Sequence, residues 1–84
     1  MHLYRYTLIE ADAASNDYQE SVQYAYATSP DAFDRLECGE GGWDGWYCHV
    51  SDVTEVSEIP QDWIDEQSQS PYFRVPTPDT ALEP

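Results

Sequence analysis

The hydrophobic and polar positions near the N-terminus alternate with a period of two residues, which is the period of a β-strand. The alternation covers residues 2–11 and returns in residues 20–28, and both segments are rich in aromatic and β-branched side chains. Asn16 and Asp17 lie between them in a small polar stretch typical of a chain reversal. The sequence therefore predicts an antiparallel hairpin with its tyrosines on a shared face. These tyrosines are Tyr4, Tyr6, Tyr24 and Tyr26.

Signals for a short helix follow the hairpin. Ser29 suits the N-cap, Pro30 suits the first helical position, and Gly39 lies just past the expected end. At about 100° per residue, one side of this helix is apolar and should cover the hairpin tyrosines Tyr24 and Tyr26, while the other side is acidic. The apolar side contains Ala32, Phe33 and Leu36, and the acidic side contains Asp31, Asp34 and Glu37.

The second half of the chain contains one more strand and one more helix. Residues 45–53 alternate again, and the chain then continues in an extended form until Pro60, which favours a short helix carrying Trp63 and Ile64. Residues 68–84 contain four of the six prolines and few apolar groups. This last segment is expected to be a loosely held tail or a strap across the surface.

These elements predict an α+β fold in the order ββαβ with a short C-terminal helix. About three antiparallel strands form the sheet, and one helix packs on one of its faces. Residues 1–67 would form a single small domain, and residues 68–84 a proline-rich tail. A chain of 84 residues has little room for a deep substrate cavity. The sequence therefore disfavours an enzyme with a large pocket.

The net charge further limits the binding partners that the chain can have. Seventeen acidic residues face three arginines, there is no lysine, and the net charge is −14. Phosphate contacts need Lys and Arg, so direct binding to nucleic acid or to an anionic membrane is disfavoured. No apolar run approaches the ~20 residues of a membrane span, and the N-terminus lacks a cationic flank followed by an apolar core. We expect a cytoplasmic protein, located in the host cytoplasm if a phage encodes it.

The glycine-rich stretch CGEGGWDGWYCH, residues 38–49, contains candidate metal ligands. A structural zinc site needs four, and the chain offers Cys38, Cys48, His49 and the distant His2. If Cys48 and His49 are consecutive in a strand, their side chains point to opposite faces and cannot share an ion or form a catalytic pair. We therefore expect no metal, no cofactor and no catalytic residue.

The same stretch is better suited to recognition. A Cys38–Cys48 disulfide is geometrically allowed, but two small buried thiols are expected in a reducing cytoplasm. One interpretation is structural: Trp46 joins the core and Trp43 is half covered. The other is functional: the glycines allow a tight loop that displays Trp43 as an aromatic anchor surrounded by charge. The loop residues assigned to partner binding are Glu40, Trp43 and Asp44.

Acidic residues also recur at intervals of three, which could hold carboxylates in a row as a phosphate backbone does. For any single triplet a solvated face is the simpler explanation, and it is the excess over the whole chain that favours a role in binding. The two triplets assigned to partner binding are Asp31, Asp34 and Glu37, and then Asp52, Glu55 and Glu58.

In length, acidity, aromatic content and expected α+β layout, the chain resembles the small phage- or plasmid-encoded inhibitors that mimic nucleic acid, including anti-CRISPR and anti-restriction proteins. The resemblance covers composition and size, and no residue is carried over from it. It implies a non-enzymatic inhibitor of a basic nucleic-acid-binding protein, such as a CRISPR effector, a restriction enzyme or a nuclease. Two alternatives stay open: an immunity protein that blocks a nuclease toxin, and a salt-adapted acidic domain of unrelated role. A homodimer also stays open.

Overall fold

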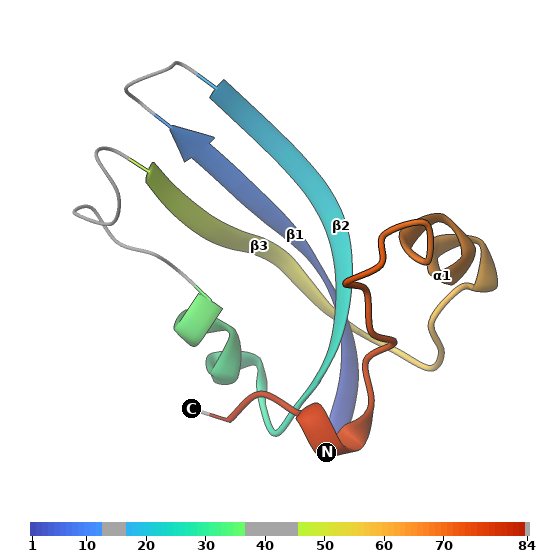
Figure 1. Ribbon diagram of the computed structural model, residues 1–84. Coiled ribbons are helices and arrows are strands. Elements are labelled where there is room, and N and C mark those ends of the chain that lie inside the picture. The colour runs from blue at the N-terminus through green and yellow to red at the C-terminus, as the bar shows by residue number, and fades with distance from the viewer. Residues whose placement is uncertain (13–16, 37–45, 84) are drawn as a thin grey trace.

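A three-stranded antiparallel sheet forms the centre of the molecule, with β1 in the middle and the order β2-β1-β3 (Figure 1). The computed structural model describes residues 1–12, 17–36 and 46–83. The predicted hairpin and third strand are confirmed, although the third strand runs past its expected end at residue 53. The strands are β1 (His2–Asp12), β2 (Asp17–Ala27) and β3 (Trp46–Val56).

The two predicted helices are present, but the first is of a different type. Residues Pro30–Leu36 form a 3-10 helix, η1, which the Ala32 amide helps to close by donating to the Ser29 carbonyl at 3.1 Å. The expected period of about 100° per residue was therefore wrong for this segment, since a 3-10 helix has three residues per turn. The helix after Pro60 is confirmed as α1 (Gln61–Gln67). A further 3-10 turn, η2, spans Pro78–Thr80.

The core lies between η1 and one face of the sheet. Phe33 is 2% exposed, and its ring centroid lies 5.4 Å from that of Tyr4 and 4.9 Å from that of Tyr6. Ala27 and Ala32 are completely buried beside it, so that η1 can approach the sheet closely. Small residues at the contact and aromatic residues around it thus fix η1 on this face.

The register corrects the expected placement of the tyrosines. Residues directly opposite each other in a pair of strands share a face, and Tyr24 lies opposite Arg5 while Tyr26 lies opposite Leu3. Tyr24 and Tyr26 therefore lie on the face away from Phe33, and the predicted cover of these two tyrosines by Phe33 is wrong. The side chain of Leu36, the other residue of that prediction, lies outside the described part of the structure.

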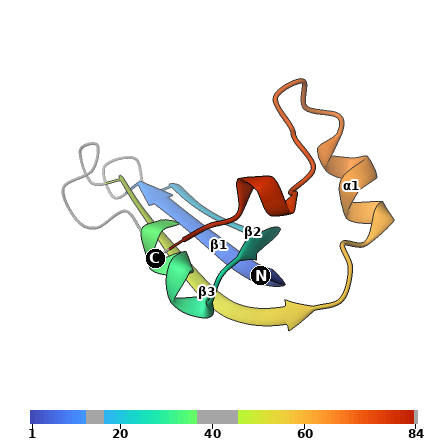
Figure 2. The same ribbon diagram turned by 90° about the horizontal axis from the view of Figure 1, so that it is seen from below.

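Trp63 of α1 covers this second face instead. Its ring packs edge-on against Tyr24 with centroids 4.9 Å apart, and its indole Nε1–H donates to the Val22 carbonyl at 2.8 Å. Phe73 packs on the other side of the tryptophan at 5.5 Å. Figures 1 and 2 show the result, with η1 and α1 on opposite sides of the sheet.

The C-terminal segment, residues 75–83, returns to the sheet as a strap along β2. Leu82 forms a parallel bridge with Ala27, in which the Leu82 amide donates to the Tyr26 carbonyl at 2.9 Å and the Thr28 amide donates to the Leu82 carbonyl at 3.1 Å. Pro76 and Pro78 precede the bridge and have no amide hydrogen to offer to a strand. The strap therefore touches the edge of β2 without extending the sheet along its length.

Candidate partner-binding surface

Asp31 and Asp34 are brought into line by η1. Side chains three residues apart eclipse each other in a 3-10 helix, and three residues advance the helix by about 6 Å. Both aspartates are exposed, whereas Ala32 and Phe33 between them are buried against the sheet. Within the described residues, neither aspartate has a cation or a hydrogen-bond donor as a partner. The 3-10 geometry thus presents two unpaired carboxylates on one line.

The acids of the second predicted triplet occupy three different settings. Asp52 is exposed at a β-bulge, where Tyr6 alone lies opposite Asp52 and Val53, and it adopts a φ of 55°. Glu55 lies in β3 and accepts a hydrogen bond of 2.8 Å from His2 Nδ1. Glu58 is exposed in the connection that follows β3. η1 packs against β3, so Asp31 and Asp34 lie on an element that neighbours the strand of Asp52 and Glu55.

The remaining predicted binding residues lie outside the described residues. These are Glu37, Glu40, Trp43 and Asp44. Cys48 tests the prediction of two free thiols, because it lies in β3 within the described residues and is disulfide-bonded. The expectation of two free thiols is therefore wrong. It rested on an assumed reducing compartment and not on any geometric property of the chain.

Positive charge does little to offset the acids in the part of the chain that is described. Arg5 and Arg74 are both exposed, and neither forms an ion pair with a described carboxylate. The His2–Glu55 contact is half exposed on both sides, at 51% and 59%, and is an ion pair only when the histidine is protonated. Most described carboxylates are thus free to meet a cation on another molecule.

The described residues hold neither a metal-binding cluster nor a helix that could span a membrane. Consecutive register positions put Cys48 opposite Glu10 and His49 opposite Ile9, so these two side chains point to opposite faces, as expected. Among residues 1–12, 17–36 and 46–83, no three His, Cys, Asp or Glu side chains lie where they could hold one metal ion. None of the helices in these ranges has the length and apolar character needed to cross a membrane.

Sequence reasoning missed two exposed aromatic residues. Tyr18 near the start of β2 is 62% exposed, and Tyr72 after α1 is 89% exposed. Both lie in stretches with mostly polar neighbours, which is the signal that could have marked them as surface residues. Tyrosine is favoured at protein interfaces, so these side chains are candidate short-range anchors, although Tyr72 follows α1 on the side of the sheet opposite to η1.

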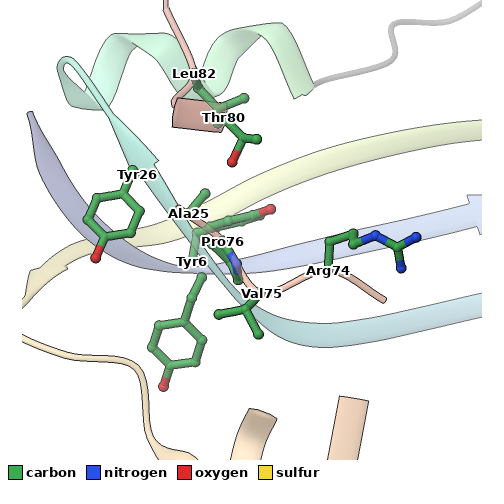
Figure 3. Close-up of a pocket in the computed structure, with 9 residues that line it drawn as sticks. Tyr6, Ala25, Tyr26, Arg74, Val75, Pro76, Thr80 and Leu82 are labelled. Carbon is green, nitrogen blue, oxygen red and sulfur yellow. The ribbon is translucent and has the colours of Figure 1, made fainter. Parts of the chain in front are cut away.

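A cavity of about 270 Å³ is a second feature that the sequence did not reveal. It lies between β2 and the strap, and Figure 3 shows its lining residues. Tyr6, Tyr24 and Tyr26 contribute from the sheet, and Val75 and Pro76 contribute from the strap. Arg74 stands at one end of the lining, apart from the labelled tyrosines (Figure 3).

The described part of the chain therefore presents exposed carboxylates on η1 and around β3, exposes Tyr18 and Tyr72 on other elements, and offers no metal site. Comparisons of the chain with protein-family models, with curated proteins and with solved structures found no match.

Proposed function

We propose that this protein is a non-enzymatic inhibitor that occupies the basic nucleic-acid-binding surface of another protein. A CRISPR effector, a restriction enzyme or a nuclease has the required chemistry, because each holds nucleic acid through Lys and Arg side chains. In this proposal the carboxylates stand in for phosphates. They steer the encounter and set its specificity, while aromatic side chains supply short-range affinity.

One observation carries the proposal. Asp31 and Asp34 are exposed, eclipsed along η1 and unpaired within the described residues. A carboxylate that served the fold would be expected to cap a helix, pair with an arginine or accept a backbone hydrogen bond. Among the described residues these two aspartates do none of this, although they raise the repulsion in a chain of net charge −14. A cationic partner would turn that repulsion into attraction.

The first experiment is a pull-down from a plausible host lysate at low and moderate salt, with the bound proteins identified. The partner should be basic, and its complex should weaken steeply as salt rises, because the contacts replace counterions. Capture of a nuclease toxin would favour an immunity protein. If the isolated protein folds only in molar salt, a salt-adapted domain is the better explanation.

The decisive variant is the double reversal Asp31→Lys with Asp34→Lys. It should weaken binding to the identified partner by about tenfold or more, because like charges facing each other across an interface cost several kcal/mol. Asp62→Lys with Asp65→Lys is the matched control, since these aspartates are also three residues apart on a short helix and the net charge changes equally. Circular dichroism should show both variants folded. Equal losses in the two variants would mean that total charge matters and its position on η1 does not.

Competition with a labelled oligonucleotide tests mimicry itself. A protein that takes the place of nucleic acid must exclude the oligonucleotide from the partner, and each ligand should displace the other. If the partner holds both at once with unchanged affinity, direct mimicry is wrong and the interaction is of another kind.

A further inference from the structure

The cavity beside β2 exists because the strap cannot lie flat on the strand. Leu82 is bridged to Ala27, but Pro76 and Pro78 offer no amide hydrogens, so the segment before Leu82 stands off from the edge. The space left is about 270 Å³. A cavity of about 150 Å³ is enough for benzene. This one therefore has room for a small ring system with a substituent.

The walls of the cavity suit an aromatic ligand. Tyr6 and Tyr24 are buried residues that turn part of their surface to it, and Tyr26, Val75 and Pro76 complete an apolar lining. Flat apolar rings gain from packing on such surfaces. Burial raises the pKa of the Tyr6 hydroxyl by removing its hydration, so this group adds no negative charge at neutral pH.

Arg74 gives the cavity a polar end. Its Nη1 donates to the neighbouring Phe73 carbonyl at 3.0 Å, and among the described residues it has no other partner. A guanidinium has five N–H donors, so most of them remain available. This is notable in a chain with seventeen acids, because a carboxylate would be its natural partner.

We propose that this cavity binds a small planar aromatic molecule that carries one carboxylate. The ring lies against Tyr24, Tyr26 and Pro76, and the carboxylate accepts two hydrogen bonds from Arg74 at one end of the lining (Figure 3). The site is separate from the acidic surface on η1, and the proposal does not depend on the function proposed for that surface.

Ionic strength should affect the two sites in opposite ways. The net charge of −14 repels an anionic ligand at long range, while the contact with Arg74 acts at short range. Raising salt from about 20 mM to about 150 mM screens the long-range repulsion, because the Debye length falls to about 8 Å. The aromatic carboxylate should then bind more tightly, whereas the complex with a basic partner should weaken.

The test uses 2-naphthoate as the probe and 2-naphthamide as its neutral match, with binding followed through the backbone amide signals of the full chain. Naphthoate should shift the amides of Tyr26, Val75 and Leu82, which surround the cavity. The substitution Arg74→Gln should weaken naphthoate binding by about tenfold and leave naphthamide binding almost unchanged, because only the charge-assisted hydrogen bonds are lost. Val75→Trp, which fills the cavity, should weaken both.

Three results would overturn the proposal. The first is that the unmodified protein does not bind naphthoate. The second is that the Arg74→Gln variant binds naphthoate as tightly as the unmodified protein. The third is that a folded Val75→Trp variant, whose tryptophan fills the cavity, still binds both probes unchanged. Because Arg74 and Val75 are both exposed, neither substitution should unfold the chain. Failure of naphthoate binding would leave the partner pull-down unaffected, so the two proposals fail separately.

Discussion

Phe33 is the residue on which the core depends most. It is 2% exposed and contacts two tyrosine rings of β1. Ala32 before it is small enough for η1 to come close to the sheet, and Asp34 after it faces solvent. The aromatic contacts of Phe33 are edge-on or tilted, the arrangements that aromatic pairs favour. A core this small has few other side chains that could replace such an area of contact.

The substitution Phe33→Ala should lower the free energy of unfolding by roughly 3–5 kcal/mol, through lost burial and the cavity left behind. This is close to the whole stability of a small domain, so thermal unfolding should begin at or near room temperature. Phe33→Leu, which keeps most of the volume, is the control and should cost less. An unchanged melting temperature for Phe33→Ala would contradict the packing of η1 on Tyr4 and Tyr6.

At the scale of elements, α1 and η1 are held in contrasting ways. η1 buries Ala32 and Phe33 in the sheet, whereas α1 has no buried residue. Within the described part of the chain, Trp63 makes both the ring contact and the hydrogen bond that join α1 to the sheet. A helix of seven residues is far shorter than the ~12–15 that are marginally stable alone. Its order must therefore come from tertiary contacts, and those of Trp63 with the sheet and with Phe73 are the main ones described.

Trp63→Ala should thus unfold α1 and leave the sheet intact. Hydrogen exchange of the backbone amides measures this directly, with protection lost over residues 61–67 and retained in the central strand β1. Trp63→Phe is the finer variant, since it keeps a ring against Tyr24 but removes the donor to the Val22 carbonyl. Its expected cost is about 1 kcal/mol. Continued protection of α1 in the alanine variant would show that other contacts hold the helix.

At the scale of the whole molecule, charge opposes folding. The chain carries −14, and most of the described carboxylates are exposed. Compaction brings these charges together, so the free protein works against its own repulsion. This property is independent of what the protein binds, and it can be measured without a partner.

The melting temperature should therefore rise between about 10 mM and about 100 mM salt, as the Debye length falls from about 30 Å to about 10 Å. Differential scanning calorimetry with NaCl measures the shift, and a neutral osmolyte at matched osmolality serves as the control. A constant melting temperature would mean that the acids are too dispersed to repel one another. Continued gain into molar salt, with no folding below it, would point to salt adaptation.

The sequence was informative where the signal is local. Alternation with a period of two marked all three strands, and Pro60 marked the start of α1, because both depend on near neighbours along the chain. The excess of acid over base likewise needs no structure to be recognised. The candidate residues Asp31 and Asp34 were predicted from their spacing together with the acidic excess of the whole chain, and η1 aligned them more closely than an α-helix would.

Tertiary structure decided what local signals cannot contain. The register put Tyr24 opposite Arg5 and so moved the tyrosines of β2 to the face away from Phe33, because a face is set by the partner strand and not by alternation alone. The strap along β2 and the cavity beneath it join residues far apart in the chain. Sequence by itself determined the elements and the charge of this protein, and only the three-dimensional pairing of its strands decided which side chains meet.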